Sequence, residues 1–118
     1  MDFSLDRKYQ LVSLNFTEPF EPEDFEHLGQ VLTPFIEDGG DIKGLLLEAN
    51  AFSQWMKVIQ AVCMPEFIQL LNKGLYIALV TDDVIDTALL AQHFNAEPRQ
   101  FSYTDKDSAL SWLIGLSR

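Results

Sequence analysis

The sequence predicts a single α/β domain over residues 1–118, with a mostly parallel sheet of four to five strands, an N-terminal hairpin and flanking helices. Two apolar runs carry this prediction, Ile42 to Ala49 and Leu75 to Thr81. Each run is short and bounded by turn residues, which is typical of a strand covered on both faces. Helical patterns alternate with these runs, which favours parallel pairing through right-handed crossovers. We therefore expect the two runs to be the central strands.

The N-terminal segment predicts a hairpin. Phe3 to Leu5 and Tyr9 to Phe16 flank the polar turn Asp6 to Lys8. Apolar and polar residues alternate in the second segment, as they do in a strand with one buried face. This hairpin should lie toward one edge of the sheet.

A long helix is predicted from about Pro22 to Asp38. Its apolar residues recur at helical spacing, and the positive end of the helix dipole stabilises the acidic residues of its first turn. Gly39-Gly40 supplies its end.

The segment after the first central strand predicts a helix that breaks at a proline. Ser53 is a suitable cap, and apolar residues from Trp55 to Val62 fall on one face. Pro65 lacks a backbone donor and forces a kink or a restart, after which the helix resumes from Glu66 to Lys73.

Two more helices and one strand complete the chain. Asp82 or Asp83 would cap a helix that begins near Ile85. Arg99 to Tyr103 forms a last short strand toward the other sheet edge, and Thr104 to Asp107 resembles a capping box that opens a terminal helix.

Charge and composition exclude several classes of function. The chain has 18 acidic and 8 basic residues, a formal net charge of -10, and no cluster of Lys or Arg. Such an acidic protein repels phosphate backbones and anionic headgroups, so we expect no nucleic-acid partner. Hydrophobic residues make up 47% of the chain, which indicates a compact, soluble protein with a hydrophobic core rather than a disordered acidic chain.

Targeting signals and disulfides are not expected. The start MDFSLDR lacks the charged-then-apolar pattern of a signal peptide, and no apolar run reaches the roughly 20 residues that span a bilayer. We therefore expect a cytoplasmic protein without an integral membrane segment. Cys63 is the only cysteine, and we expect it to pack as a small core hydrophobe.

Several hydrophobic and positional features extend from about residue 9 to residue 116: Glu23-Asp24-Phe25 with Leu28, Pro34 to Glu37, Gly40 to Leu47 followed by Phe52 and Trp55, Ile77 to Val80, and Phe101 with Ala109 to Leu113. Together these features resemble the SpoIIAA-like family, small STAS-type α/β domains related to anti-sigma factor antagonists. The resemblance implies a non-enzymatic regulatory or binding domain that acts through protein-protein contacts. Related folds add an alternative, a carrier or sensor of a small apolar or lipid-like ligand.

One departure from the family concerns phosphorylation. Anti-sigma factor antagonists present an Asp-Ser-Ser type motif where the strand after the first long helix meets the next helix, and this chain has Asn50 to Trp55 there. Ser53 is the nearest hydroxyl, so it is the candidate phosphoacceptor. The ordinary alternative is that Ser53 only caps the helix.

No set of residues in the sequence converges on catalysis. Glu48, Asp82 and Asp83 at neighbouring strand ends have the oxygens that Mg²⁺ accepts, but such acids also cap helices and solvate strand ends. His27 and His93 are far apart in the sequence and form no ligand pair. We therefore predict no enzymatic activity, no metal site and no cofactor.

The segment from Phe52 to Met64 is the predicted working surface. It begins at the C-terminal end of a central strand, where open sheets bind ligands, and it carries more apolar residues than one buried stripe requires. We expect it to contact a protein partner, a second copy in a homodimer, or an apolar small molecule held between the sheet and this helix. The predicted contact residues are Phe52, Ser53, Trp55, Met56 and Ile59. The ordinary alternative is that these residues only cover the sheet.

Overall fold

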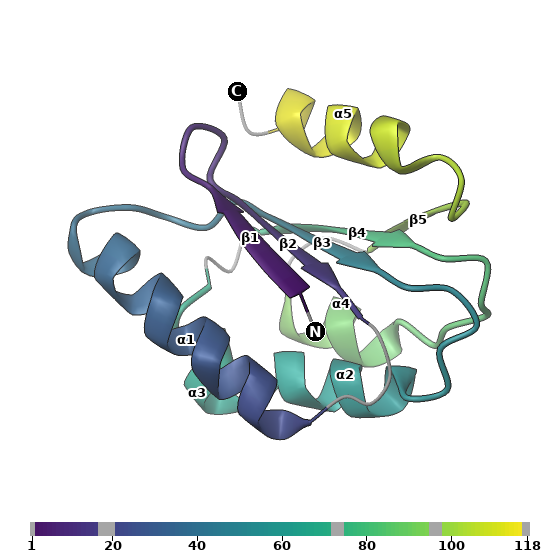
Figure 1. The fold of residues 1–118 in the computed structure, drawn as a ribbon, viewed down its shortest axis with the longest axis horizontal. Helices are drawn as coiled ribbons and strands as arrows, with labels where there is room; N and C mark the ends of the chain where they lie inside the picture. The colour runs from purple at the N-terminus through teal and green to yellow at the C-terminus, as the bar shows by residue number, and fades with distance from the viewer. Residues whose placement is uncertain (1, 17–20, 72–74, 95–97, 117–118) are drawn as a thin grey trace.

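A computed structural model shows a five-stranded sheet with helices on both faces (Figure 1). The structure describes residues 2–16, 21–71, 75–94 and 98–116. In sheet order the strands are β1 (Asp2–Asp6), β2 (Leu11–Asn15), β3 (Gly44–Glu48), β4 (Tyr76–Val80) and β5 (Arg99–Phe101). The helical segments are α1 (Pro22–Glu37), α2 (Trp55–Val62), α3 (Pro65–Ile68), α4 (Ala88–His93) and α5 (Lys106–Leu116). The predicted α/β class is therefore confirmed.

The sheet is mixed. β1 pairs antiparallel with β2, whereas β2 with β3, β3 with β4, and β4 with β5 are parallel pairs. The carboxylate of Asp6 accepts the backbone N–H groups of Lys8 at 3.0 Å and Tyr9 at 3.1 Å, which closes the hairpin turn. The predicted hairpin (β1 and β2), the two predicted central strands (β3 and β4) and the edge strand β5 are all confirmed, with β3 at the centre.

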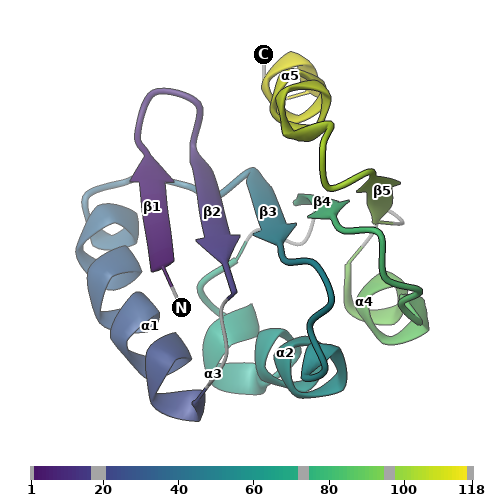
Figure 2. The same cartoon turned by 45° about the vertical axis from the view of Figure 1, so that its right-hand side comes forward.

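The helices are distributed unequally over the two faces of the sheet. Figure 2 shows α1 to α4 on one face and α5 by itself on the other. Strand order follows chain order, so the crossovers from β2 to β5 all step in the same direction across the sheet. Parallel crossovers of one hand that step in one direction place their helices on the same face. This rule accounts for the shared layer of α1, α2 with α3, and α4.

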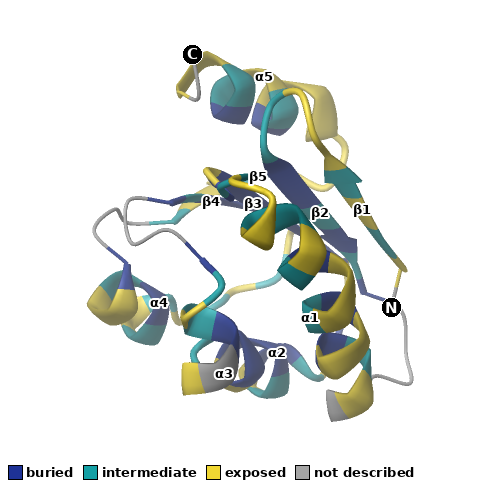
Figure 3. Cartoon of the chain, turned by 90° about the vertical axis from the view of Figure 1, so that its left-hand side faces the viewer, coloured by how far each residue is buried: buried dark blue, intermediate teal, exposed yellow. Residues whose placement is uncertain are grey.

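The larger core lies between the sheet and this four-helix layer. Alternate residues of β2, β3 and β4 point into it and are almost fully buried: Val12, Leu14, Leu45, Leu47, Ile77 and Leu79. Leu28 and Leu32 of α1 and Val58 and Ile59 of α2 meet them. Figure 3 shows the buried strands in the middle and exposed residues along the outer side of α1. The apolar residues that recur at helical spacing and those that alternate along the strands therefore pack into one common core.

A smaller core lies beneath α5. The strand residues Leu11, Leu46, Ala78 and Val80 pack there with Ala109 and Leu113 of α5. Gly44 begins β3 under this helix, where an added Cβ would overlap the side chain of Leu11. The missing side chain at residue 44 therefore leaves room for Leu11 beneath α5.

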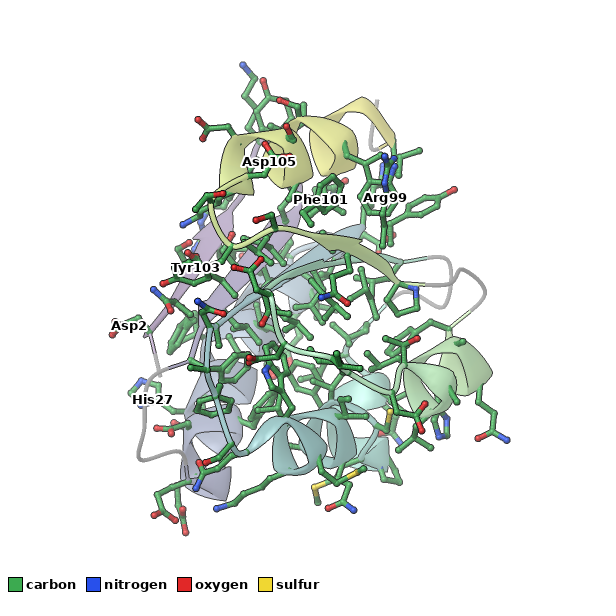
Figure 4. All side chains as sticks on the ribbon, turned by 90° about the vertical axis from the view of Figure 1, so that its right-hand side faces the viewer. Asp2, His27, Arg99, Phe101, Tyr103 and Asp105 are labelled. Carbon is green, nitrogen blue, oxygen red and sulfur yellow. The ribbon has the colours of Figure 1, made fainter. Side chains whose placement is uncertain are left out.

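Cation–π contacts of Arg99 join the β5 edge of the sheet to α5. The Arg99 guanidinium lies 5.0 Å from the ring centre of Phe101 and 5.6 Å from that of Trp112. Figure 4 shows Arg99 and Phe101 in the space between β5 and α5. Each stacked pair of this kind adds about 0.5–1 kcal/mol at an exposed site.

The first helix matches its predicted bounds. The capping box at its start joins Glu21 and Asp24, with the Glu21 N–H donating to Asp24 Oδ2 at 3.1 Å. Asp38 is its C-cap, and Gly39 follows at a φ of 92°. That left-handed conformation favours glycine and ends the helix as predicted.

Two predicted helix caps are wrong. α2 begins after Gln54 rather than after Ser53, and α4 begins after Thr87 rather than after Asp82 or Asp83. Both aspartates accept hydrogen bonds from other loops, so their carboxylates are not available to a helix start. Tertiary contacts therefore override the local preference of these residues for a cap.

Other bounds differ by a few residues. α5 begins at Lys106, so the predicted capping box from Thr104 lies one residue too early, and Asp105 Oδ1 instead accepts the Ser108 hydroxyl at 2.7 Å. The helix predicted from Glu66 to Lys73 ends at Ile68, and residues 72 and 73 of its expected span lie outside the described part of the chain. The predicted break at Pro65 is confirmed, because α2 and α3 are separate segments.

Candidate functional site

Two loops meet at the C-terminal edge of the sheet, and the carboxylate of Asp83 joins them. It accepts the backbone N–H groups of Ala51 at 3.1 Å and Phe52 at 3.0 Å, and the indole Nε1–H of Trp55 at 2.9 Å. Ala51 has a φ of 52°, in the left-handed region. Such a residue lets successive backbone N–H groups converge on one anion. We call Asp83 and its three donors the Asp83 latch.

Hydrogen bonds to Thr81 and from Gln100 of β5 hold the backbone around Asp83 in place. The Asp83 N–H donates to Thr81 Oγ1 at 3.0 Å, and Gln100 Nε2 of the β5 strand donates to the carbonyl oxygens of Thr81 and Asp83, both at 2.9 Å. The hydrogen bond from Phe52 lowers the pKa of Asp83 most, followed by that from Trp55. The carboxylate is therefore ionised at neutral pH. Its contacts tie the loops after β3 and β4 into one unit.

Aromatic rings fill the space between this edge of the sheet and the helices. The ring of Phe16 lies 5.8 Å from Phe52, 6.0 Å from Trp55 and 6.2 Å from Phe25, measured between centroids. Phe25 in turn meets the edge of Phe67 at 5.2 Å. The location predicted for an apolar ligand, between the sheet and α2, is therefore occupied by side chains of the protein itself.

The five predicted contact residues do not share one surface. Phe52, Trp55 and Ile59 are buried and face the sheet, whereas Ser53 and Met56 are exposed. Met56 is the outward member, with 59% of its surface exposed. Helical geometry explains the split within the helix, since Trp55 and Ile59 are one turn apart on the buried face, whereas Met56 is turned about 100° from Trp55 and lies at the exposed edge of that face. The role of Ser53 as a phosphoacceptor stays a prediction.

The three acids at the strand ends have separate partners. Glu48 is buried and pairs with Lys106 Nζ of α5 at 2.8 Å. Asp82 Oδ1 accepts the Ser102 hydroxyl at 3.0 Å and the Tyr103 N–H at 3.2 Å, while Asp83 forms the latch. Within the described residues, no three His, Cys, Asp or Glu side chains are grouped as a metal ion requires.

The single cysteine and the histidines also have ordinary surroundings. The Cys63 thiol donates to the Leu89 carbonyl at 3.9 Å, and burial raises its pKa, so the thiol stays protonated at neutral pH. It packs against the larger core, as predicted. His27 is exposed and meets the ring of Phe3 at 5.8 Å, and His93 is exposed at the end of α4.

A groove of about 630 Å³ opens on the outer side of the helical layer, between α1 and the α2–α3 segment. Its lining consists of Glu23, Phe25, Glu26, Gly29, Gln30, Thr33, Ala61, Met64, Phe67 and Leu70. We call it the α1–α3 groove. Met64, half exposed beside Pro65, is the most accessible apolar side chain in it. The groove is lined mainly by apolar surface, and it is open on one side.

Most of the predicted working surface, Phe52 to Met64, lies outside this groove. Of the predicted segment Phe52 to Met64, only Ala61 and Met64 line it. The sequence did not predict the α1 residues of the groove as a site, because their spacing is also typical of the solvent-exposed face of an ordinary helix. Two signals were present in the sequence: Gly29 within a long helical pattern, and Met64 directly before a proline.

The described residues include no helix with both the length and the apolar character to cross a bilayer. Comparison of the chain with protein-family models, curated proteins and solved structures gives no match in any of the three. Membership of the SpoIIAA-like family therefore stays a prediction.

Proposed function

We propose that this protein is a non-enzymatic binding domain that acts through contacts with a protein partner, and that a segment of the partner lies in the α1–α3 groove. The observation that carries this proposal is an open, largely apolar groove on the outside of the helical layer, separate from the core that packs between this layer and the sheet. Helix-lined grooves of this kind are a recurrent mode of peptide recognition. A regulatory role follows from the resemblance to anti-sigma factor antagonists.

A carrier of a small apolar molecule is the second candidate. The groove volume of about 630 Å³ lies within the range of small-molecule sites. Its open side argues for the protein partner, because small-molecule sites usually enclose most of the ligand surface. The same groove would serve either function, so the experiment must separate them.

A random-peptide display library tests the proposal. The wild type should select peptides, and Gly29→Leu should abolish their binding, because the new side chain enters the groove next to Leu70. Gly115→Leu is the matched control, since it adds the same side chain to a helical glycine on α5 with open space around it. Its binding should equal that of the wild type.

Native mass spectrometry of the purified protein addresses the second candidate. If a bound apolar molecule is lost in Gly29→Leu and the wild type selects no peptides, the groove binds a small molecule rather than a protein partner.

Trp112→Phe leaves Trp55 as the only indole. Because Trp55 is buried in the aromatic group beside the latch, its emission should stay constant when fatty acids are added.

A further inference from the structure

The two walls of the α1–α3 groove differ in chemistry. The α2–α3 wall carries an apolar side chain at every third residue, Ala61, Met64, Phe67 and Leu70. Met64 is half exposed and Leu70 partly exposed, whereas Ala61 and Phe67 are largely buried and form the floor of the groove. The α1 wall is mostly polar apart from Phe25 and Gly29, and Glu23 and Glu26 are the only charged side chains among the described residues that line the groove. Both glutamates are exposed. An occupant must therefore offer an apolar stripe to one wall and polar groups to the other.

Two contacts fix the relative direction of the walls. The rings of Phe25 and Phe67 lie 5.2 Å apart, and a Cβ at Gly29 would lie 3.6 Å from Leu70 Cδ1. Positions 25 and 29 of α1 are thus level with positions 67 and 70, so both walls run the same way. Met64 accordingly lies toward the end of the groove that carries the two glutamates.

We propose that the partner segment is an amphipathic helix with Lys or Arg at one end, placed over Glu23 and Glu26. The α1 wall extends from Glu23 to Thr33, roughly 15 Å at 1.5 Å per residue, which matches about three turns of a bound helix. Apolar residues of that helix at i, i+3 and i+7 fit the evenly spaced apolar wall. Its cations oppose the acidic end, and this complementarity favours association and fixes the orientation.

Charge also decides against a second copy of the chain as the occupant. The protein has a formal net charge of -10, so two copies repel each other at long range. The inference rests on the proposed function and adds the chemistry of the partner. A homodimer through the groove is one of the outcomes that the experiment distinguishes.

The test uses a displayed library of helical peptides with a fixed apolar stripe and random flanking residues. Selection on the wild type should enrich Lys and Arg at one end and deplete Asp and Glu there. The best peptide is then synthesised, and its affinity is measured by fluorescence anisotropy. Glu23→Gln with Glu26→Gln should weaken it about three- to tenfold, as expected for two exposed charge contacts, and added salt should reduce that difference.

The matched control removes two charges elsewhere. Asp2→Asn with Asp107→Asn changes the net charge equally at exposed positions on β1 and α5, and its affinity should equal that of the wild type. Selected peptides without basic enrichment, or equal weakening by both double variants, would overturn the charged-helix inference while leaving a groove-binding function. No peptide sensitive to Gly29→Leu would overturn both proposals. Sedimentation as a dimer that Gly29→Leu dissociates would assign the groove to a second copy.

Discussion

The indole Nε1–H of Trp55 donates to the carboxylate of Asp83 at 2.9 Å, so the first turn of α2 is held by a residue from the loop after β4. The same carboxylate accepts two backbone N–H groups from the loop after β3. A single side chain thus connects the C-terminal ends of the neighbouring parallel strands β3 and β4. Loops at this edge commonly carry binding sites in open sheets, and here they are fixed by an internal anion.

Asp83→Asn should lower the free energy of unfolding by about 1–3 kcal/mol, the cost of breaking hydrogen bonds to a charged group. The amide loses the charge and turns an NH₂ group toward donors that need an acceptor. Urea denaturation followed by circular dichroism measures the change. Asp107→Asn, at an exposed position in the first turn of α5, serves as the control and should change stability by much less. Equal midpoints for both variants would show that the latch contributes no stability.

The stabilisation by Asp83 should disappear in acid. Its folded-state pKa is lowered by hydrogen bonds, so the folded protein favours the ionised form more than the unfolded chain does. The stabilisation is therefore complete above the unfolded pKa of about 3.9 and is lost as the pH falls through the folded value. The difference in unfolding free energy between the wild type and Asp83→Asn should be constant from pH 7 to 5 and shrink below pH 4. A difference that grows in acid would contradict the latch.

Lys106→Met should destabilise the protein by about 1–3 kcal/mol, because it leaves the buried carboxylate of Glu48 without its cation. The double variant with Glu48→Gln removes the charge as well and should recover part of the loss. Thermal and urea unfolding of the two single variants and the double variant give the coupling energy between the side chains. Additive effects would mean that the ion pair does not fix α5 on the sheet.

Gly29→Ala should raise the free energy of unfolding by about 0.5–1 kcal/mol, because glycine is costly inside a helix and the added Cβ makes only an ordinary contact with Leu70. Gly44→Ala is the contrasting change. Its Cβ would overlap Leu11 beneath α5, so a loss of about 1–3 kcal/mol is expected from overpacking. Denaturation midpoints of the two variants should therefore move in opposite directions. A shift of Gly44→Ala to higher stability would show that Leu11 can move aside.

Local pattern was sufficient for most of the architecture. The apolar runs around Leu46 and Leu79 became the interior strands, since a short run of this type can bury both faces only inside a covered sheet. The helical stripe ending at Gly39 became α1, and Pro65 separated α2 from α3. These features depend on neighbours within a few residues, which is the range that sequence periodicity reports.

The candidate site was less accessible to such reasoning. The sequence placed Trp55 and Ile59 on one helical face, but that face turned out to be core, and Met56 lies at its exposed edge. Periodicity identifies which residues share a face. It does not say whether the face meets the sheet or solvent.

The sequence by itself determined the α/β class, the interior strands, the position of the first helix and the acidic charge of the protein. Only the tertiary structure decided that Asp83 holds Trp55 rather than capping a helix, that Glu48 pairs with Lys106, and that a groove lies beside Gly29. The physical reason is that a carboxylate at a strand end has the same local chemistry whether it caps, latches or pairs. Its role is chosen by donors that are distant in the chain, and a groove likewise exists only once two separate helices have been brought together.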